Sequence, residues 1–151
     1  MEIKLDPLSK EILNCLQENA RASYAEIGRK VGLTSPAVAE RIKKLEDLGV
    51  ITGYQAKIAY AKLGYQLKAM VTLRAFVGKL KPFLEQVKSY EEVINCYRIT
   101  GNENIIMEVV IKDQMHLENF IDRLIVYGEA RTHIVLSKVA GSNSLINPKK
   151  Q

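Results

Sequence analysis

Between Thr34 and Leu48 the sequence predicts a helix that carries small polar and charged side chains on one face. Val38, Ile42 and Leu45 recur at helical spacing and mark the opposite, apolar face. Polar side chains on such a helix can hydrogen bond to base edges, and its free N-terminal N–H groups can bind a phosphate. The pattern therefore favours a helix that lies in the major groove of DNA.

The neighbouring elements distinguish this interpretation from a plain amphipathic helix whose polar face is only solvated. Ser23 begins a short helix, and Glu26 three residues later completes the capping-box pattern. Residues 50–58 then read as a short hairpin with Thr52-Gly53 as its turn. A short helix, a tight turn, a second helix and a hairpin together predict a winged helix-turn-helix.

The polar residues of this module have individual expected roles. Ser35 lies where a hydroxyl and free N–H groups can bind a phosphate, and Arg41 and Lys44, off the outer face, are expected to contact phosphates. Glu40 either accepts from a cytosine amino group or pairs with Lys44 four residues on. Lys57 follows the hairpin and is placed to reach the backbone of the minor groove. The full set expected at DNA is Ser23, Tyr24, Thr34, Ser35, Pro36, Ala37, Ala39, Glu40, Arg41, Lys43, Lys44 and Lys57.

The second half of the chain changes from helical to strand-like spacing. Strands are predicted over 67–76, 93–100, 104–111 and 130–139, and helices over 79–89 and 114–126. The order β-α-β-β-α-β is that of a ferredoxin-like unit, so the fold class is α+β. We expect a DNA-binding domain with its connector over 1–62, a second domain over 63–141 and a flexible tail over 142–151.

Several of these strands are apolar on both faces. In the predicted strand over 67–76, Met70 alternates with the main apolar set, and Ile106 and Val110 do so in the strand over 104–111. Two helices cover only one face of such a sheet, so the other face is expected to pack against a partner. The most economical partner is the same sheet of a second copy, which predicts a two-fold dimer.

Composition excludes several classes of protein. The net charge is +5, and residues 1–62 carry 10 basic and 8 acidic side chains, so positive charge is not concentrated in the DNA module. Such a module is expected to bind weakly alone and to act through paired copies. Neither a membrane-spanning apolar run nor a signal peptide is predicted, which favours the cytoplasm. Cys15 and Cys96 are expected to be buried free thiols, and no metal or cofactor site is predicted.

The sequence resembles the Lrp/AsnC (feast/famine) transcriptional regulators along nearly its whole length. The resemblance lies in LDPLSKEILNCLQENARASYAEIGRKVGLTSPAVAERIKKLEDLGVITGY and, more diverged, in VINCYRITGNENIIMEVVI. It implies a winged helix-turn-helix followed by a ligand-sensing domain often called RAM. It also implies dimers that assemble into octamers or open arrays, bind and bend promoter DNA, and respond to an amino acid.

The resemblance also places an effector site at the loop that follows the second predicted strand. Family members have Gly, two residues, Asp and an aromatic residue there; this chain has Gly101, and then Asn104 and Ile105 in place of the last two. An Asp can pair with the ammonium of an amino acid, whereas Asn offers a neutral acceptor. The residues that the resemblance assigns to an effector are Thr100, Gly101, Asn102, Glu103, Asn104, Asp113, Thr132, His133 and Ile134.

Two other functions remain open at the level of sequence. An architectural DNA-compacting protein without an effector is favoured by the even charge distribution and by Asn104. Some siroheme decarboxylases resemble this family in both halves and use histidines at the tetrapyrrole, but His116 and His133 are the only histidines here. Both are expected to be structural or solvated. No P-loop, dinucleotide fingerprint or nucleophile motif is present, so the primary prediction is a regulator and not an enzyme.

Overall fold

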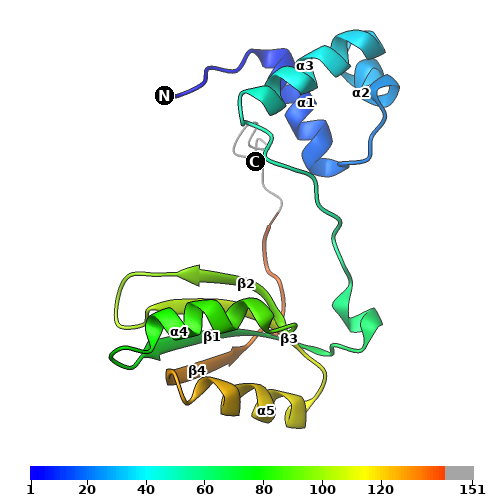
Figure 1. Ribbon diagram of the computed structural model, residues 1–151. Helices are drawn as coiled ribbons and strands as arrows, with labels where there is room; N and C mark the ends of the chain where they lie inside the picture. Colours follow the sequence, from blue (N-terminus) through cyan, green and yellow to red (C-terminus); the bar gives the residue numbers. More distant parts are fainter. Residues whose placement is uncertain (142–151) are drawn as a thin grey trace. The chain divides into compact units, whose positions relative to one another are not determined.

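The first of two compact units contains the three N-terminal helices. The computed structural model describes residues 1–141, so the tail predicted over 142–151 lies outside the described residues. Among the described residues, 1–57 and 139–141 form one unit and 58–138 the other (Figure 1), and each unit is described by itself. In the first unit the chain forms α1 (Pro7–Glu18), α2 (Tyr24–Val31) and α3 (Ser35–Asp47).

Local signals set the ends of these helices. Ser23 and Glu26 form the reciprocal capping box at the start of α2, with N–O distances of 3.1 and 2.7 Å. Thr34, rather than Ser35, caps α3 by accepting from the backbone N–H of Ala37. Gly32 ends α2 in the left-handed conformation at φ 74°, which a residue without Cβ adopts at little cost. The helices enclose a core of Ile12, Ile27, Val38 and Ile42.

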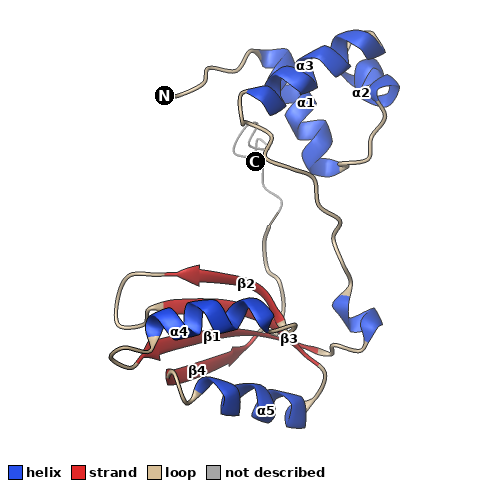
Figure 2. Cartoon of the chain, viewed as in Figure 1, coloured by secondary structure: helices blue, strands red, loops and turns tan. Residues whose placement is uncertain are grey.

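The wing hairpin predicted over residues 50–58 is wrong. No β-strand forms there, and the chain leaves α3 as a single extended segment (Figure 2). Its first two N–H groups, from Val50 and Ile51, both bond to the carbonyl of Leu45 and close the end of α3. Ile51 packs on the core, and the hydroxyl of Tyr54 donates to Glu46 at 2.8 Å. These contacts hold the segment against the helices, and an isolated two-stranded hairpin is only marginally stable.

The second unit is the predicted ferredoxin-like domain. Its elements are the 3-10 turn η1 (Tyr60–Leu63), β1 (Leu67–Ala75), α4 (Leu80–Gln86), the 3-10 turn η2 (Val87–Ser89), β2 (Val93–Arg98), β3 (Ile105–Ile111), α5 (Gln114–Leu124) and β4 (Gly128–Ile134). The four strands are antiparallel in the order β2-β3-β1-β4, so β1 and β3 are central (Figure 2). The fold class and the order of elements are confirmed, although the last predicted strand begins and ends earlier than expected.

The two faces of this sheet differ in what covers them. Ala69, Val71 and Leu73 of β1 are fully buried and pack with Phe83 of α4 and Phe120 of α5. Both helices therefore cover one face. The other face carries Met70 and Ile106 in its centre, as expected, but Lys68, Asn95 and Glu108 there form an ion pair and a hydrogen bond. The uncovered face is thus mixed, with apolar Met70 and Ile106 next to the paired polar side chains.

Candidate DNA interface and effector loop

The α3 helix presents the residues predicted to face DNA. Thr34, Pro36, Glu40, Lys43 and Lys44 are exposed, whereas Ser35, Ala37, Ala39 and Arg41 are half-buried. The expected pairing of Glu40 with Lys44 is not formed among the described residues, so neither charge is neutralised by the other. Free cations on an exposed helix face are suited to phosphate contacts, and a free carboxylate is suited to a cytosine amino group.

The start of α2, which precedes α3 in the sequence, carries two further residues that are expected to contact DNA. Ser23 is exposed, but its hydroxyl accepts from the N–H of Glu26. Tyr24 is 47% exposed and leaves a phenol available at the first turn of α2. A tyrosine hydroxyl can donate to a phosphate, so Tyr24 keeps its expected role as a DNA contact. The hydroxyl of Ser23 is less available for such a contact, because it already bonds to Glu26.

Arg41 has a partner that its sequence neighbourhood does not suggest. Its Nη1 donates to Oδ2 of Asp6 at 2.7 Å and to the hydroxyl of Ser9 at 3.3 Å. Asp6 also accepts from the N–H of Ser9 at 2.7 Å as the cap of α1. The Arg41 guanidinium, followed by Ser9, holds the pKa of the Asp6 carboxyl well below its ordinary value. The structure therefore directs this arginine toward α1.

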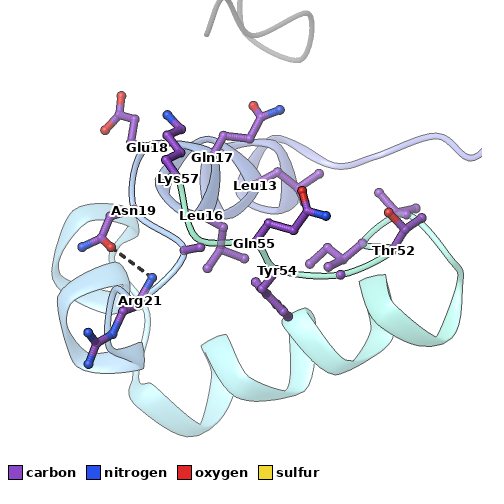
Figure 3. A pocket seen from close by; sticks show the side chains of 14 residues that line it. Leu13, Leu16, Gln17, Glu18, Asn19, Arg21, Thr52, Tyr54, Gln55 and Lys57 are labelled. Carbon is purple, nitrogen blue, oxygen red and sulfur yellow. Dashed lines mark hydrogen bonds between the residues drawn. The ribbon is translucent and has the colours of Figure 1, made fainter. Parts of the chain in front are cut away.

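Lys57 lies in a groove of about 510 Å³ at the far end of α1. Figure 3 shows its side chain beside Glu18 and Gln17, while Tyr54 points toward α3. The groove has an apolar floor that includes Leu13 and Leu16. Because no hairpin forms, no element projects Lys57 toward the minor groove, as the predicted wing would have done. Burial raises the pKa of Tyr54 to about 12, with its bond to Glu46 as the second cause.

The loop predicted to bind an effector is organised around Asn104. Its side-chain Oδ1 accepts from the N–H of Ala75 at 2.8 Å, and its backbone N–H donates to Leu73 at 2.9 Å. Its carbonyl accepts from the N–H of Ile99. Asn104 thus ties the end of β1 to the turn between β2 and β3. A carboxylate can accept from the same N–H group, but asparagine does so without negative charge.

The remainder of the loop is more exposed. Gly101 adopts φ 111°, a region that side chains disfavour, and the turn around Asn102 is exposed. Glu103 pairs with Arg131 of β4 at 3.5 Å. This loop therefore has a neutral amide at its base and a neutralised carboxylate at its side.

The other residues assigned to an effector do not join this loop within one chain. Asp113 caps α5 by accepting from the N–H of His116 at 2.8 Å, beyond the far end of β3 from Asn104. β3 has seven residues, which separate its ends by about 20 Å. Thr132, His133 and Ile134 lie on β4 opposite Val71, Met70 and Ala69. Thr132 and Ile134 share the helix-covered face, while His133 lies on the uncovered one.

Sequence reasoning missed a buried glutamate that is paired with a histidine and an arginine at the edge of the sheet. The side chain of Glu92 is only 4% exposed, and its Oε1 accepts from Nε2 of His116 at 3.0 Å and from Arg123. Nδ1 of His116 accepts from the backbone N–H of Lys112, so Nε2 carries the proton in a neutral ring. The cluster fastens α5 to the start of β2. A glutamate directly before an apolar strand was its only local signal.

The described helices include none that is both long enough and apolar enough to cross a membrane.

Comparison with known proteins gives two family matches. Residues 5–46 match the AsnC-type helix-turn-helix domain, and residues 68–145 match the Lrp/AsnC ligand binding domain. The first match contains all of α1 and α2 and most of α3. The second contains all but the first residue of β1, the whole of β2 to β4, and both helices that cover the sheet.

Individual relatives agree with these matches over most of the chain. The HTH-type transcriptional regulator YezC of Bacillus subtilis (strain 168) is 39% identical over 133 residues, which are 88% of this chain and 94% of that protein. The structure of LrpC from B. subtilis has a TM-score of 0.85 at 28% identity and covers 91% of this chain and 99% of its own. The structure of the transcriptional regulator NMB0573 in complex with L-Met, from Neisseria meningitidis, has a TM-score of 0.86 at 25% identity. It covers 94% of this chain and 96% of its own.

These matches decide between a transcriptional regulator and an enzyme. The relatives are transcriptional regulators rather than enzymes, and both halves of the chain carry the corresponding domains. The helix that the sequence singled out lies within the matched helix-turn-helix, and the loop at Gly101 lies within the matched ligand-binding domain. The chain belongs to the Lrp/AsnC family and is a transcriptional regulator with a DNA-binding helix-turn-helix and a ligand-binding domain.

Proposed function

We propose that this regulator binds specific DNA sites as a dimer or a higher even-numbered assembly, with α3 in the major groove. The observation that carries the proposal is the exposed face of α3, on which Glu40, Lys43 and Lys44 have no ion-pair partner among the described residues. Lys43 and Lys44 contact phosphates, and Glu40 is placed to read a cytosine. Such regulation of promoters takes place in the cytoplasm.

The dimer forms through the uncovered face of the sheet. Its apolar side chains include Met70 and Ile106, and exposed Tyr97 of β2 lies next to Ile106. Because one helix-turn-helix has few free cations, its phosphate contacts alone give modest affinity. Two modules joined by their sheets bind two half-sites at once, which raises the affinity of the pair.

A binding titration tests sequence specificity. The protein is titrated against the upstream region of its own gene and against random duplexes of equal length, at several salt concentrations. We expect tighter binding to the upstream region, at a ratio of about 10³ or more at physiological salt. Equal affinities at every salt concentration would instead favour the architectural function, to which the even charge distribution and neutral Asn104 point.

We further propose that a small effector binds at the loop from Thr100 to Asn104 with residues of a neighbouring chain. Asp113 lies at the opposite end of the sheet from this loop, so a pocket that includes both needs a second copy. An amino acid is the first ligand to test, because the NMB0573 structure is a complex with L-Met. Calorimetric titration with the twenty amino acids, repeated on Gly101→Val, should show heat that the variant abolishes.

A further inference from the structure

The contact between Arg41 and Asp6 joins the middle of α3 to the first turn of α1. One carboxylate makes both bonds: Oδ1 accepts from the N–H of Ser9 and caps α1, while Oδ2 accepts from Arg41. Both distances are 2.7 Å, and the same Arg41 nitrogen also reaches the Ser9 hydroxyl at 3.3 Å. The helix cap and the interhelical bond are therefore a single unit.

The apolar core and the bond between Arg41 and Asp6 constrain α3 in different ways. Ile12 of α1 packs with Val38 and Ile42 of α3, which sets the distance between these two helices. Apolar contacts of this kind are not directional. A charge-assisted hydrogen bond is directional and constrains both rotation and sliding of α3. Arg41 follows Glu40 and precedes Lys43, so a rotation of α3 moves both of these exposed side chains.

The contact also affects what Arg41 can do at DNA. The guanidinium faces a carboxylate whose side chain is 50% exposed, and Arg41 itself is 31% exposed. A phosphate would have to displace Asp6, and the freed Asp6 would repel it. Lys43 and Lys44, by contrast, have no such partner among the described residues and are immediately available to phosphates.

We propose that Asp6 and Arg41 are positioning residues that hold α3 in the orientation needed for sequence-specific contacts, and that Arg41 is not a phosphate contact. The pair acts through Glu40 and the other exposed residues of α3. Its loss therefore lowers the discrimination between specific and random DNA, while the electrostatic part of binding is retained.

Two variants of the full-length protein test this proposal: Arg41→Gln and Asp6→Asn. Asparagine still caps α1, so Asp6→Asn removes the ion pair without removing the cap. The DNA is a site selected from a random-sequence duplex library, with scrambled duplexes for comparison. Affinity is measured across salt concentrations, and circular dichroism confirms that each variant is folded. Lys43→Gln is the control for loss of a phosphate contact, and Lys88→Gln, in the other unit, is the control for a change of charge alone.

For both variants we expect the ratio of specific to random affinity to fall by roughly fivefold to tenfold. The salt slope of Arg41→Gln should match that of the wild type, whereas Lys43→Gln should lose about 0.9 of slope. The double variant should be no worse than either single variant, because one bond is removed in all three. If Arg41→Gln loses about 0.9 of slope and Asp6→Asn leaves the ratio unchanged, Arg41 contacts phosphate and the proposal is wrong. Should Arg41→Gln not fold, Asp6→Asn alone decides through the same ratio.

Discussion

At the scale of single residues, Glu92 shows how a buried charge is retained. Burial alone raises the pKa of this carboxyl, but hydrogen bonds from its own backbone, His116 and Arg123 outweigh burial, and the net pKa is lowered. One oxygen, Oε2, is buried and has no partner within the described part of the chain. The ionised carboxylate therefore depends on His116 and Arg123, and removing its charge leaves the Arg123 guanidinium without a charged partner.

Replacing Glu92 with glutamine should destabilise the second unit by about 2 kcal/mol at neutral pH, because Arg123 loses its charged partner. The loss is not larger, since Arg123 is partly exposed and recovers some solvation. A lowered pKa contributes stability above the ordinary value of 4.5, and this is lost as the pH falls below it. The difference between wild type and variant should therefore shrink toward acid pH. Urea unfolding at several pH values measures it. Glu91→Gln, at the exposed neighbour, should match the wild type; a similar loss there would contradict the role of Glu92.

At the scale of elements, the turn between α2 and α3 depends on Gly28. A Cβ built on Gly28 lies 2.3 Å from the carbonyl oxygen of Leu33, which is backbone and cannot swing away. The same turn is closed by the N–H of Leu33, which donates to the carbonyl of Gly28 at 3.0 Å. The glycine thus permits the close approach that sets the angle between the two helices.

Gly28→Ala should destabilise the first unit by about 2 kcal/mol, since the steric cost exceeds the roughly 1 kcal/mol that alanine gains in helix propensity. DNA affinity should fall with it, because α3 loses its fixed approach to α2. Thermal unfolding followed by circular dichroism, together with a DNA titration, measures both effects. Lys30→Ala, an exposed change in the same helix, should change stability by no more than about 0.5 kcal/mol. A stabilised Gly28→Ala would show that the turn adapts.

The sequence predicted those elements whose causes are local. The capping box of Ser23 and Glu26 lies within four residues, and the alternation along β1 follows from its own side chains. The wing was wrongly predicted because Tyr54 and Ile51 are held by α3 and the core, which no local pattern reveals. The partner of Arg41 was missed because Asp6 lies 35 positions away. Secondary-structure propensity depends on residues that are close in sequence, whereas the contacts that orient the site join residues that are distant in sequence.

At the scale of the whole molecule, the proposed function requires a second copy. The uncovered sheet face carries Ile106 at its centre, between Thr72 of β1 and Tyr97 of β2. Glu108, opposite Met70 on the central strand β3, is paired with Lys68 within the chain, so both can approach a partner without leaving free charge. Apolar side chains together with internally satisfied polar groups are suited to a protein interface.

Ile106→Glu should separate the dimer, because it places two unpaired carboxylates at the centre of a two-fold contact. Light scattering at micromolar concentration should give the mass of a single 17.0 kDa chain. Asn119→Glu adds the same charge on the exposed side of α5 and should leave the assembly intact. Wild-type protein that is already monomeric would contradict the proposed dimer.

The same variant separates assembly from recognition. Binding to a duplex with two half-sites should weaken by about 10² or more in Ile106→Glu, since the second module is no longer held at high effective concentration. Binding to a duplex with one half-site should hardly change, because α3 and its tie to Asp6 are untouched. Equal losses on both duplexes would mean that the sheet face stabilises the helix-turn-helix itself, and the paired sheets would then have no separate part in spacing the two modules.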